Sequence, residues 1–119
     1  MATFTKEKLS ASTDGKPILV AGTATASADT IHTGSTTAAT YHEVWLWAMN
    51  TSTTAVKLTV EWGGATAGFL IEQTIPGEAG LVMVAPGLLV KGNATAVIIK
   101  AFAGTTNVIN ITGYVNVIA

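Results

Sequence analysis

Acid–base or metal chemistry would have to come from two histidines and seven carboxylates, which are scattered along the 119 residues of the chain. A zinc site needs three or four ligands at close spacing, and the neighbours His42 and Glu43 would point to opposite faces of a strand. We therefore expect His32 and His42 to be loop-edge or interface residues rather than metal ligands. The carboxylates occur singly, at Glu7, Asp14, Asp29, Glu43, Glu61, Glu72 and Glu78.

Sequence motifs of catalysis are also missing. A glycosidase needs two carboxylates that face each other, and no motif pairs any two of the seven. No serine occurs in a Gly-x-Ser-x-Gly motif, and Gly63-Gly64 lacks the Gly-Lys-Ser/Thr end of a phosphate-binding loop. Cysteine is absent, which excludes a cysteine nucleophile, a thiolate zinc site and a disulfide framework. We therefore predict a protein that is not an enzyme and that uses no metal or cofactor.

Ligand binding by aromatic side chains is the remaining chemistry that the residues suggest. All three tryptophans lie between positions 45 and 62. They could form either one wall of a hydrophobic core or a flat platform for a sugar ring. Residues 55–62 alternate apolar and polar side chains, which is typical of a half-buried strand. Together with residues 43–50 and the polar link 51–54, they predict a β-hairpin.

The register of this hairpin determines which side chains share a face. If residues 51–54 are the loop, Trp47 lies opposite Leu58 and Trp45 lies opposite Val60, on a wholly apolar face. We therefore interpret Trp45 and Trp47 as core residues, and a sugar platform is the alternative.

The opposite face of the hairpin carries Val44 and Leu46 among polar residues, so these two side chains need a cover. The cover could be the N-terminal stretch 1–16, in which Phe4 and Leu9 are isolated apolar residues, or a neighbouring subunit. We therefore predict that Phe4, Leu9, Val44 and Leu46 contact another subunit or a partner protein. On this interpretation Leu46→Asp would weaken assembly, whereas Trp47→Ala would weaken folding.

The rest of the sequence predicts short strands separated by glycine, proline and asparagine turns. Roughly eight such strands favour a single-domain, all-β sandwich of antiparallel strands, and eight strands in two sheets suggest a jelly roll. We assign residues 1–16 to an N-terminal arm and residues 17–119 to the β-sandwich domain. The expected strands are 18–20, 30–33, 43–50, 55–62, 69–75, 81–85, 95–102 and 108–118, with a brief segment at 88–90 after a turn at Pro86-Gly87.

Composition limits the classes of partner. The net charge is −1, 11% of residues are charged, and the chain has lysines but no arginine. It therefore lacks the clustered basic residues with which nucleic-acid-binding proteins neutralise phosphates. No apolar run approaches the roughly 20 residues of a membrane helix, and the first residues lack the pattern of a signal peptide. We expect neither nucleic acid nor membrane as a partner. The hydrophobic fraction of 49% suggests instead that partner proteins cover part of the surface.

Segments spread over most of the chain carry a resemblance to a known class of proteins. They are Ser12-Thr13-Asp14-Gly15-Lys16-Pro17, Thr30-Ile31-His32-Thr33, Glu43-Val44-Trp45-Leu46-Trp47-Ala48-Met49-Asn50, Leu58-Thr59-Val60-Glu61-Trp62-Gly63-Gly64, Ile75-Pro76-Gly77 and Asn107-Val108-Ile109-Asn110-Ile111-Thr112-Gly113-Tyr114-Val115-Asn116. With these segments the chain resembles small virion proteins encoded among the structural genes of tailed bacteriophages.

The resemblance implies a capsid decoration, or cement, protein that is made in the host cytoplasm and binds the outer surface of the assembled head. Its partners would be the major capsid protein or other virion proteins, and such proteins often form homotrimers. A tail or head–tail junction protein is one alternative. A glycan-binding β-sandwich is another, because of the tryptophans and the glycine-rich loop at 63–68.

Overall fold

Short β-strands make up most of the chain, as the sequence predicts. The computed structural model describes residues 3–119, so residues 1 and 2 of the expected arm lie outside the described residues. Within residues 3–119, no helix is long and apolar enough to cross a membrane. The elements follow one another as β1 (Phe4–Lys8), β2 (Ile18–Val20), η1 (Thr25–Ser27), β3 (Asp29–Thr33), β4 (Tyr41–Asn50), β5 (Val56–Trp62), η2 (Ala67–Phe69), β6 (Leu70–Ile75), β7 (Val82–Lys91), β8 (Ile98–Ala103) and β9 (Ile109–Ile118).

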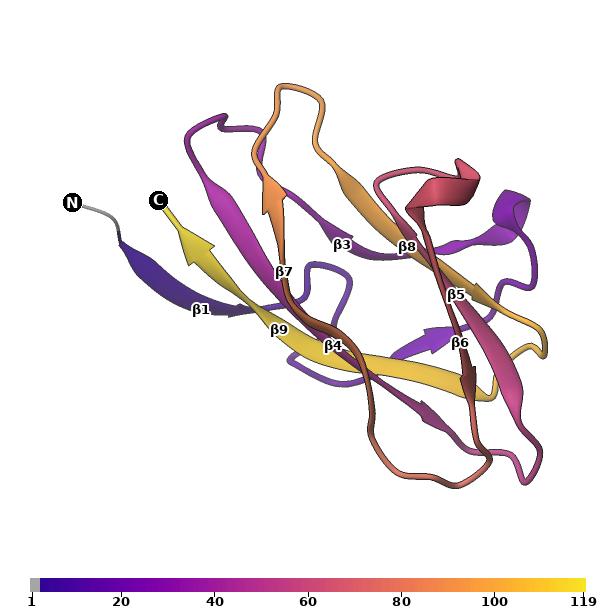
Figure 1. Cartoon of the computed structure of the whole chain (residues 1–119). Helices are drawn as coiled ribbons and strands as arrows, with labels where there is room; N and C mark the ends of the chain where they lie inside the picture. Colours follow the sequence, from indigo (N-terminus) through magenta and orange to yellow (C-terminus); the bar gives the residue numbers. More distant parts are fainter. Residues whose placement is uncertain (1–2) are drawn as a thin grey trace.

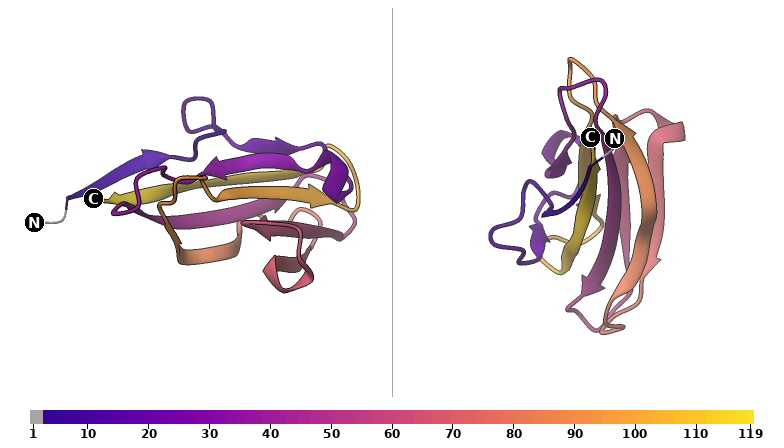
Figure 2. Two further views of the ribbon diagram at one scale, coloured as in Figure 1. Left: turned by 90° about the horizontal axis from the view of Figure 1, so that it is seen from above. Right: turned by 90° about the vertical axis from the view of Figure 1, so that its left-hand side faces the viewer.

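The strands form two antiparallel sheets (Figures 1 and 2). The first sheet has the order β1-β9-β4-β7, with β2 also paired to β9, and the second has the order β3-β8-β5-β6. The pairs are nested along the chain: β5 with β6 is innermost, followed by β4 with β7, β3 with β8 and β2 with β9. Such nesting of eight strands in two sheets is the jelly-roll topology, and it confirms the predicted β-sandwich.

The N-terminal segment extends the first sheet. β1 pairs with the end of β9, from Phe4 opposite Ile118 to Lys8 opposite Tyr114. Thr3 and Ala119 exchange backbone hydrogen bonds of 2.6 and 3.0 Å, so the two ends of the described chain lie side by side at one end of the molecule (Figure 1). Residues 4–8 of the expected arm are therefore a strand of the domain.

The core between the sheets is aliphatic. Alternate residues of β4 and β9 point inward from the first sheet, and alternate residues of β5 and β8 point inward from the second. Burying each larger aliphatic side chain contributes about 1.5–3 kcal/mol, so this layer is the main source of stability. The fully buried aliphatic residues of these four strands are Val44, Leu46, Ala48, Leu58, Val60, Ile99, Ala101, Ala103, Ile109, Ile111 and Val115.

The predicted hairpin of residues 43–50 and 55–62 is wrong. β4 pairs with β7 and β9, whereas β5 pairs with β6 and β8, so the link after Asn50 carries the chain from one sheet to the other. A short polar link between two apolar strands is compatible with both geometries, and only the pairing partners distinguish a hairpin from a crossing.

The buried Asn50 side chain stabilises this crossing. Its Nδ2 donates to the carbonyl oxygens of Thr54 at 2.8 Å and of Ile75 at 2.9 Å. Its Oδ1 accepts from the amide of Ser52 at 2.9 Å and from the Ser52 hydroxyl at 2.7 Å. Four hydrogen bonds satisfy both donors and the acceptor of the amide, which explains why a polar side chain is tolerated at a position that is 2% exposed.

The turn predicted at Pro86-Gly87 is also wrong, because β7 continues through both residues. The pairing of β7 with β4 shifts register beside them, as at a β-bulge. β7 is an edge strand, where the missing N–H of a proline need not interrupt the hydrogen-bond ladder. Gly87 has a φ of 74°, which glycine adopts without strain.

Candidate functional site

Trp45 and Trp47 lie on the outer face of the first sheet. Successive side chains of a strand point to opposite faces, and Val44, Leu46 and Ala48 occupy the buried positions of β4. The two tryptophans are half-buried. The prediction that they are core residues is therefore wrong, because it depended on the hairpin register.

Three aromatic rings meet on this outer face. Tyr114 lies opposite Trp45 on the neighbouring strand β9. The ring centroids of Trp45 and Trp47 are 6.2 Å apart, those of Trp45 and Tyr114 are 6.2 Å apart, and those of Trp47 and Tyr114 are 6.1 Å apart. The angles between the ring planes are 17°, 15° and 28° in the same order. The three rings therefore form one cluster with nearly parallel planes.

Polar and steric contacts fix the position of Trp45. Its Nε1 donates to Glu43 Oε1 at 2.8 Å, and Asn116 Nδ2 donates to the same oxygen at 2.9 Å. These two hydrogen bonds favour the ionised carboxylate and hold the pKa of Glu43 below its ordinary value. On β7, a Cβ atom at Gly87 would lie 2.8 to 3.4 Å from three atoms of the Trp45 ring. The Trp45 ring thus lies over Gly87, and any larger residue at position 87 would displace the ring.

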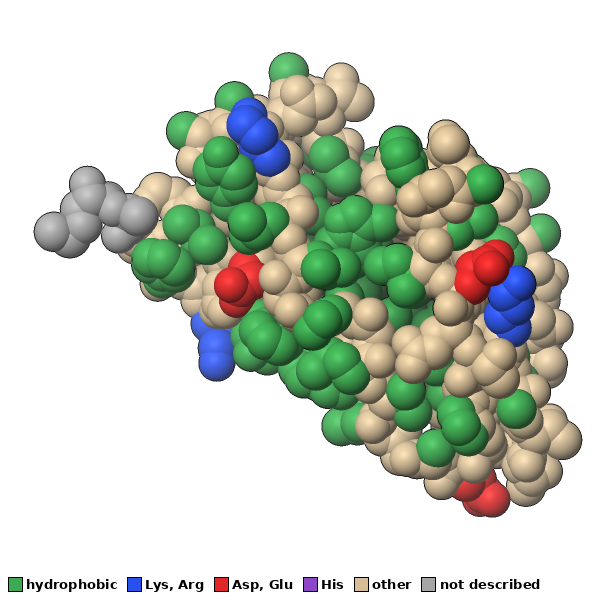
Figure 3. Space-filling model, in the orientation of Figure 1, with side chains coloured by type: hydrophobic (Ala, Val, Ile, Leu, Met, Phe, Trp, Pro, Cys, Tyr) green, Lys and Arg blue, Asp and Glu red, His purple; other side chains and the backbone are tan. Residues whose placement is uncertain are grey.

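The rings belong to a wider apolar surface, which we call the aromatic face. Five of the nine large hydrophobic side chains that remain exposed among residues 3–119 lie on it, with exposed fractions from 37% to 70%. Figure 3 shows hydrophobic side chains, with isolated acidic and basic ones between them, in the half of the molecule that contains the first sheet. By strand register and exposure, the aromatic face consists of Phe4, Leu19, Tyr41, Trp45, Trp47, Met83, Leu89 and Tyr114.

Lysine side chains share this outer face: by register Lys8 lies opposite Tyr114 and Lys91 opposite Tyr41, and Lys6 lies over a ring. Lys6 Nζ is 4.7 Å from the centroid of the Tyr114 ring, within the range of a cation–π interaction. It lies on β1, in the register position opposite Asn116. Lys6, Glu43 and Asn116 therefore place polar groups beside the rings.

The four residues predicted to contact a partner have different positions. Phe4 is 70% exposed and belongs to the aromatic face, whereas Leu9, Val44 and Leu46 are at most 1% exposed. The expectation that Val44 and Leu46 form an outer surface is wrong, because the aliphatic residues of β4 face the other sheet. Leu9 packs in the same core, so its side chain cannot reach another molecule while the domain is folded.

The two histidines form a pair between the sheets. His32 on β3 is 3% exposed, and its Nε2 lies 2.8 Å from Nδ1 of His42 on β4. Because the amide of Ser10 donates to His32 Nδ1 at 3.0 Å, the proton of His32 is on Nε2, which donates to His42. Burial is the main reason that the pKa of His32 is lowered to about 4. Within residues 3–119, no three His, Asp or Glu side chains are grouped to hold a metal ion.

The importance of Tyr114 was not recognised from the sequence, although a signal for it exists. The alternation in residues 108–118 places Ile109, Ile111 and Val115 on one face of a strand and Tyr114 on the other, and in the structure the first three are buried whereas Tyr114 is on the outer face. What the sequence did not reveal is that β9 lies beside β4. Without that pairing, the tyrosine could not be connected with the tryptophans.

Comparisons with known proteins leave the chain without a family assignment. No protein-family model, curated protein sequence or solved structure matches it. Any functional conclusion therefore depends on the chain's residues and geometry and on the resemblance that its sequence segments carry.

Proposed function

We propose that this chain is a non-enzymatic structural protein of a tailed-phage particle, and that it decorates the head by docking its aromatic face on the major capsid protein or another virion protein. One observation carries the proposal: the aromatic face is a broad apolar surface outside a core that is already closed by the two sheets. On soluble proteins, large exposed apolar patches mark interaction sites. The resemblance of the chain to small phage virion proteins supplies the kind of partner.

The residue types of the aromatic face support a protein partner. Tryptophan, tyrosine and methionine are enriched at the centres of protein–protein interfaces, where charged residues are depleted. Residues that carry most of the binding energy are often tryptophan and tyrosine in well-packed positions. Trp45 has this character, because Glu43 and Gly87 fix its ring before any partner binds. A preorganised ring loses little side-chain entropy on docking.

The same face is available to the alternatives within this class of function. A homotrimer, which we predict from the resemblance, could bury part of it between copies of the chain. A tail or head–tail junction protein would use it against a different virion protein. Size-exclusion chromatography with light scattering measures the oligomeric state, and a mass of three chains is the expected result.

Co-sedimentation with emptied heads of the phage that encodes the chain tests the proposal. We expect the wild-type protein to sediment with the heads and Met83→Glu, on the aromatic face, to lose at least tenfold in affinity. Leu81→Glu is the matched control, because Leu81 is 60% exposed and lies outside the strands of both sheets, and it should bind like the wild type. Wild-type protein that stays in the supernatant would count against decoration of the head.

A glycan-binding function is the second candidate, and the surface position of Trp45 and Trp47 favours it. Nearly parallel aromatic rings with a carboxylate and an amide beside them could stack on sugar rings and bond their hydroxyls. Tryptophan fluorescence distinguishes the two candidates. Docking on a protein predicts an emission shift with phage heads and none with soluble oligosaccharides, whereas glycan binding predicts a saturable shift with an oligosaccharide.

A further inference from the structure

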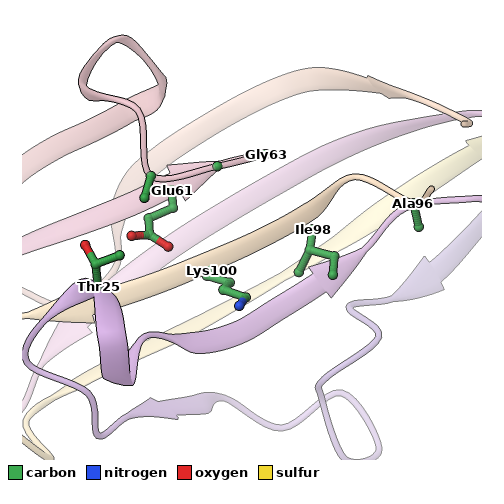
Figure 4. Close-up of a pocket in the computed structure, with 8 residues that line it drawn as sticks. Thr25, Glu61, Gly63, Ala96, Ile98 and Lys100 are labelled. Carbon is green, nitrogen blue, oxygen red and sulfur yellow. The ribbon is translucent and has the colours of Figure 1, made fainter.

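A second candidate site lies on the outer face of the second sheet, away from the aromatic face. It is a pocket of about 320 Å³ between η1, the outward residues of β5 and β8, and the glycine-rich loop that follows β5. Glu61 and Lys100 occupy opposite register positions on β5 and β8, and both side chains point into this space, with Thr25 at its rim (Figure 4). The residues used below are Thr25, Glu61, Gly63, Gly64, Ile98 and Lys100.

Glu61 is the unusual residue of this pocket. It is 4% exposed, and its Oε2 atom is buried without a hydrogen-bond partner. No ion pair within 4.0 Å joins it to Lys100; among the described residues such a pair is found between Lys57 and Glu72. Burying a carboxylate without compensation is costly, and buried polar atoms in folded proteins nearly always have a partner. An unpartnered carboxylate oxygen in a pocket therefore points to a ligand.

We propose that this pocket binds a neutral ligand with adjacent hydroxyl groups, such as a single sugar ring or a small polyol. A hydroxyl both donates and accepts hydrogen bonds. Neighbouring hydroxyls can donate to the Glu61 carboxylate while their own oxygens accept from Lys100 Nζ and the Thr25 hydroxyl. Hydrogen bonds with an ionised partner are the stronger kind, so one diol would use both charged groups of the pocket.

The charges of the pocket argue against charged ligands. Lys100 would repel a cation drawn to Glu61, and Glu61 would repel an anion drawn to Lys100, so the pair selects for neutral molecules. The size also limits the ligand, because about 320 Å³ is at the small end of the roughly 300–1,000 Å³ of ligand pockets. Ile98 supplies an apolar wall for the carbon side of a ring. Gly63 and Gly64 add no side chains to the loop wall, where a Cβ atom would approach Val97 and Phe69.

Amide chemical shifts of the full chain, measured by NMR during titration with D-glucose, D-galactose, D-mannose and glycerol, test this proposal. We expect at least one of them to shift the amides of Gly63, Gly64 and Thr25 saturably, with the Trp45 indole N–H unmoved. Glu61→Gln should weaken that binding at least tenfold, because it replaces a charged acceptor oxygen with a donor. Glu72→Gln is the matched control on the neighbouring strand, where the carboxylate is exposed, and should bind like the wild type.

Two results would overturn the proposal. One is the absence of saturable shifts at Gly63, Gly64 and Thr25 with every probe up to 100 mM, a dissociation constant that corresponds to about 1.4 kcal/mol of binding free energy. The other is a saturable shift with methylguanidinium or calcium chloride but with none of the neutral probes, which would make the occupant a cation. Because the pocket and the aromatic face lie on different sheets, neither result bears on docking to a phage head.

Discussion

The two outer faces of this sandwich both consist of the outward side chains of antiparallel strands, but one face is apolar and the other carries buried polar groups. On the first sheet, outward positions hold aromatic and aliphatic side chains that remain partly exposed. On the second sheet, the outward residues of β5 are Lys57, Thr59 and Glu61, and Thr59 and Glu61 are buried at 4% exposure each. One face is thus an exposed apolar surface, for which we propose a large protein partner, and the other encloses polar groups, for which we propose a small ligand. Both are compatible with the same aliphatic core.

The largest expected effect is the difference in stability between substitutions at two adjacent residues, Leu46 in the core and Trp47 on the aromatic face. Leu46→Asp should unfold the domain, because an unpaired charge in the core costs more than about 4 kcal/mol. Trp47→Asp should leave it folded, with a loss of about 1–2 kcal/mol, because the indole is half-buried on the outer side. Urea unfolding followed by circular dichroism measures both. A stable Leu46→Asp protein would mean that the two faces of β4 have been assigned the wrong way round.

The next largest effect on stability is expected at Asn50, where the chain crosses from β4 in the first sheet to β5 in the second. Asn50→Ala should lower the free energy of unfolding by about 3 kcal/mol, since it leaves buried groups at Thr54, Ile75 and Ser52 without partners. Asn110→Ala, on the half-buried outer side of β9, is the control and should change it by less than about 0.5 kcal/mol. Chemical denaturation at neutral pH provides the comparison. Equal losses in the two variants would show that the Asn50 network does not stabilise the crossing.

Acid should weaken the contact between the sheets. The pKa of His32 is about 4 in the folded chain, whereas the ordinary value of 6.5 applies in the unfolded chain. Between pH 4 and pH 6.5 the unfolded chain therefore binds a proton that the folded chain does not bind. Stability from this group is therefore complete above pH 6.5 and falls as the pH decreases to 4, by roughly 3 kcal/mol. Burial also lowers the pKa of His42, although the charge of Glu7 opposes this shift. Besides burial, the charges of His42 and Lys8 lower the pKa of His32.

The variant His32→Gln isolates this contribution. Glutamine can accept from Ser10 and donate to His42 without titrating, so stability measured by urea unfolding at pH 7, 6, 5 and 4 should decline less steeply than in the wild type. Parallel pH profiles for the two proteins would exclude His32 as the source of acid sensitivity.

The smallest effect tests how Trp45 is held on the aromatic face. Gly87→Ala introduces a Cβ that meets the Trp45 ring at a positive φ, whereas Gly80→Ala, at a φ of 72°, has no atom within 4 Å of its Cβ. Both changes strain the backbone by about 1 kcal/mol, so the difference between their thermal midpoints reports the Trp45 contact alone. Gly87→Ala should melt lower and shift the tryptophan emission. Identical behaviour of the two variants would mean that the ring does not rest on Gly87.

Sequence reasoning predicted the strands well and their pairing poorly, and β4 shows why. Alternation indicates which side chains share a face, but Val44, Leu46 and Ala48 on one face are as apolar as Trp45, Trp47 and Met49 on the other. Only the partner strands determine which set lies inside, and those partners, β7 and β9, are distant in sequence. The aliphatic set packs inward in this thin sandwich, and the larger rings remain outside.

The candidate sites were harder to predict than the fold for the same reason. Tyr114 reaches the tryptophans because β9 lies beside β4, and Glu61 lies opposite Lys100 because β8 lies beside β5. Neither juxtaposition has a local sequence motif. The Pro86-Gly87 pair was misleading because an edge strand tolerates the combination that ordinarily ends a strand.

The most direct test of the proposed head decoration is the position of the chain in intact phage particles that are proposed to carry it, determined by electron cryomicroscopy. Docking through the aromatic face predicts density for the sandwich on the outer surface of the head, with the β1-β9-β4-β7 sheet turned toward a neighbouring protein and Trp45, Trp47 and Tyr114 inside the contact. A particle in which these three rings face solvent, while another surface of the domain makes the contact, would contradict it.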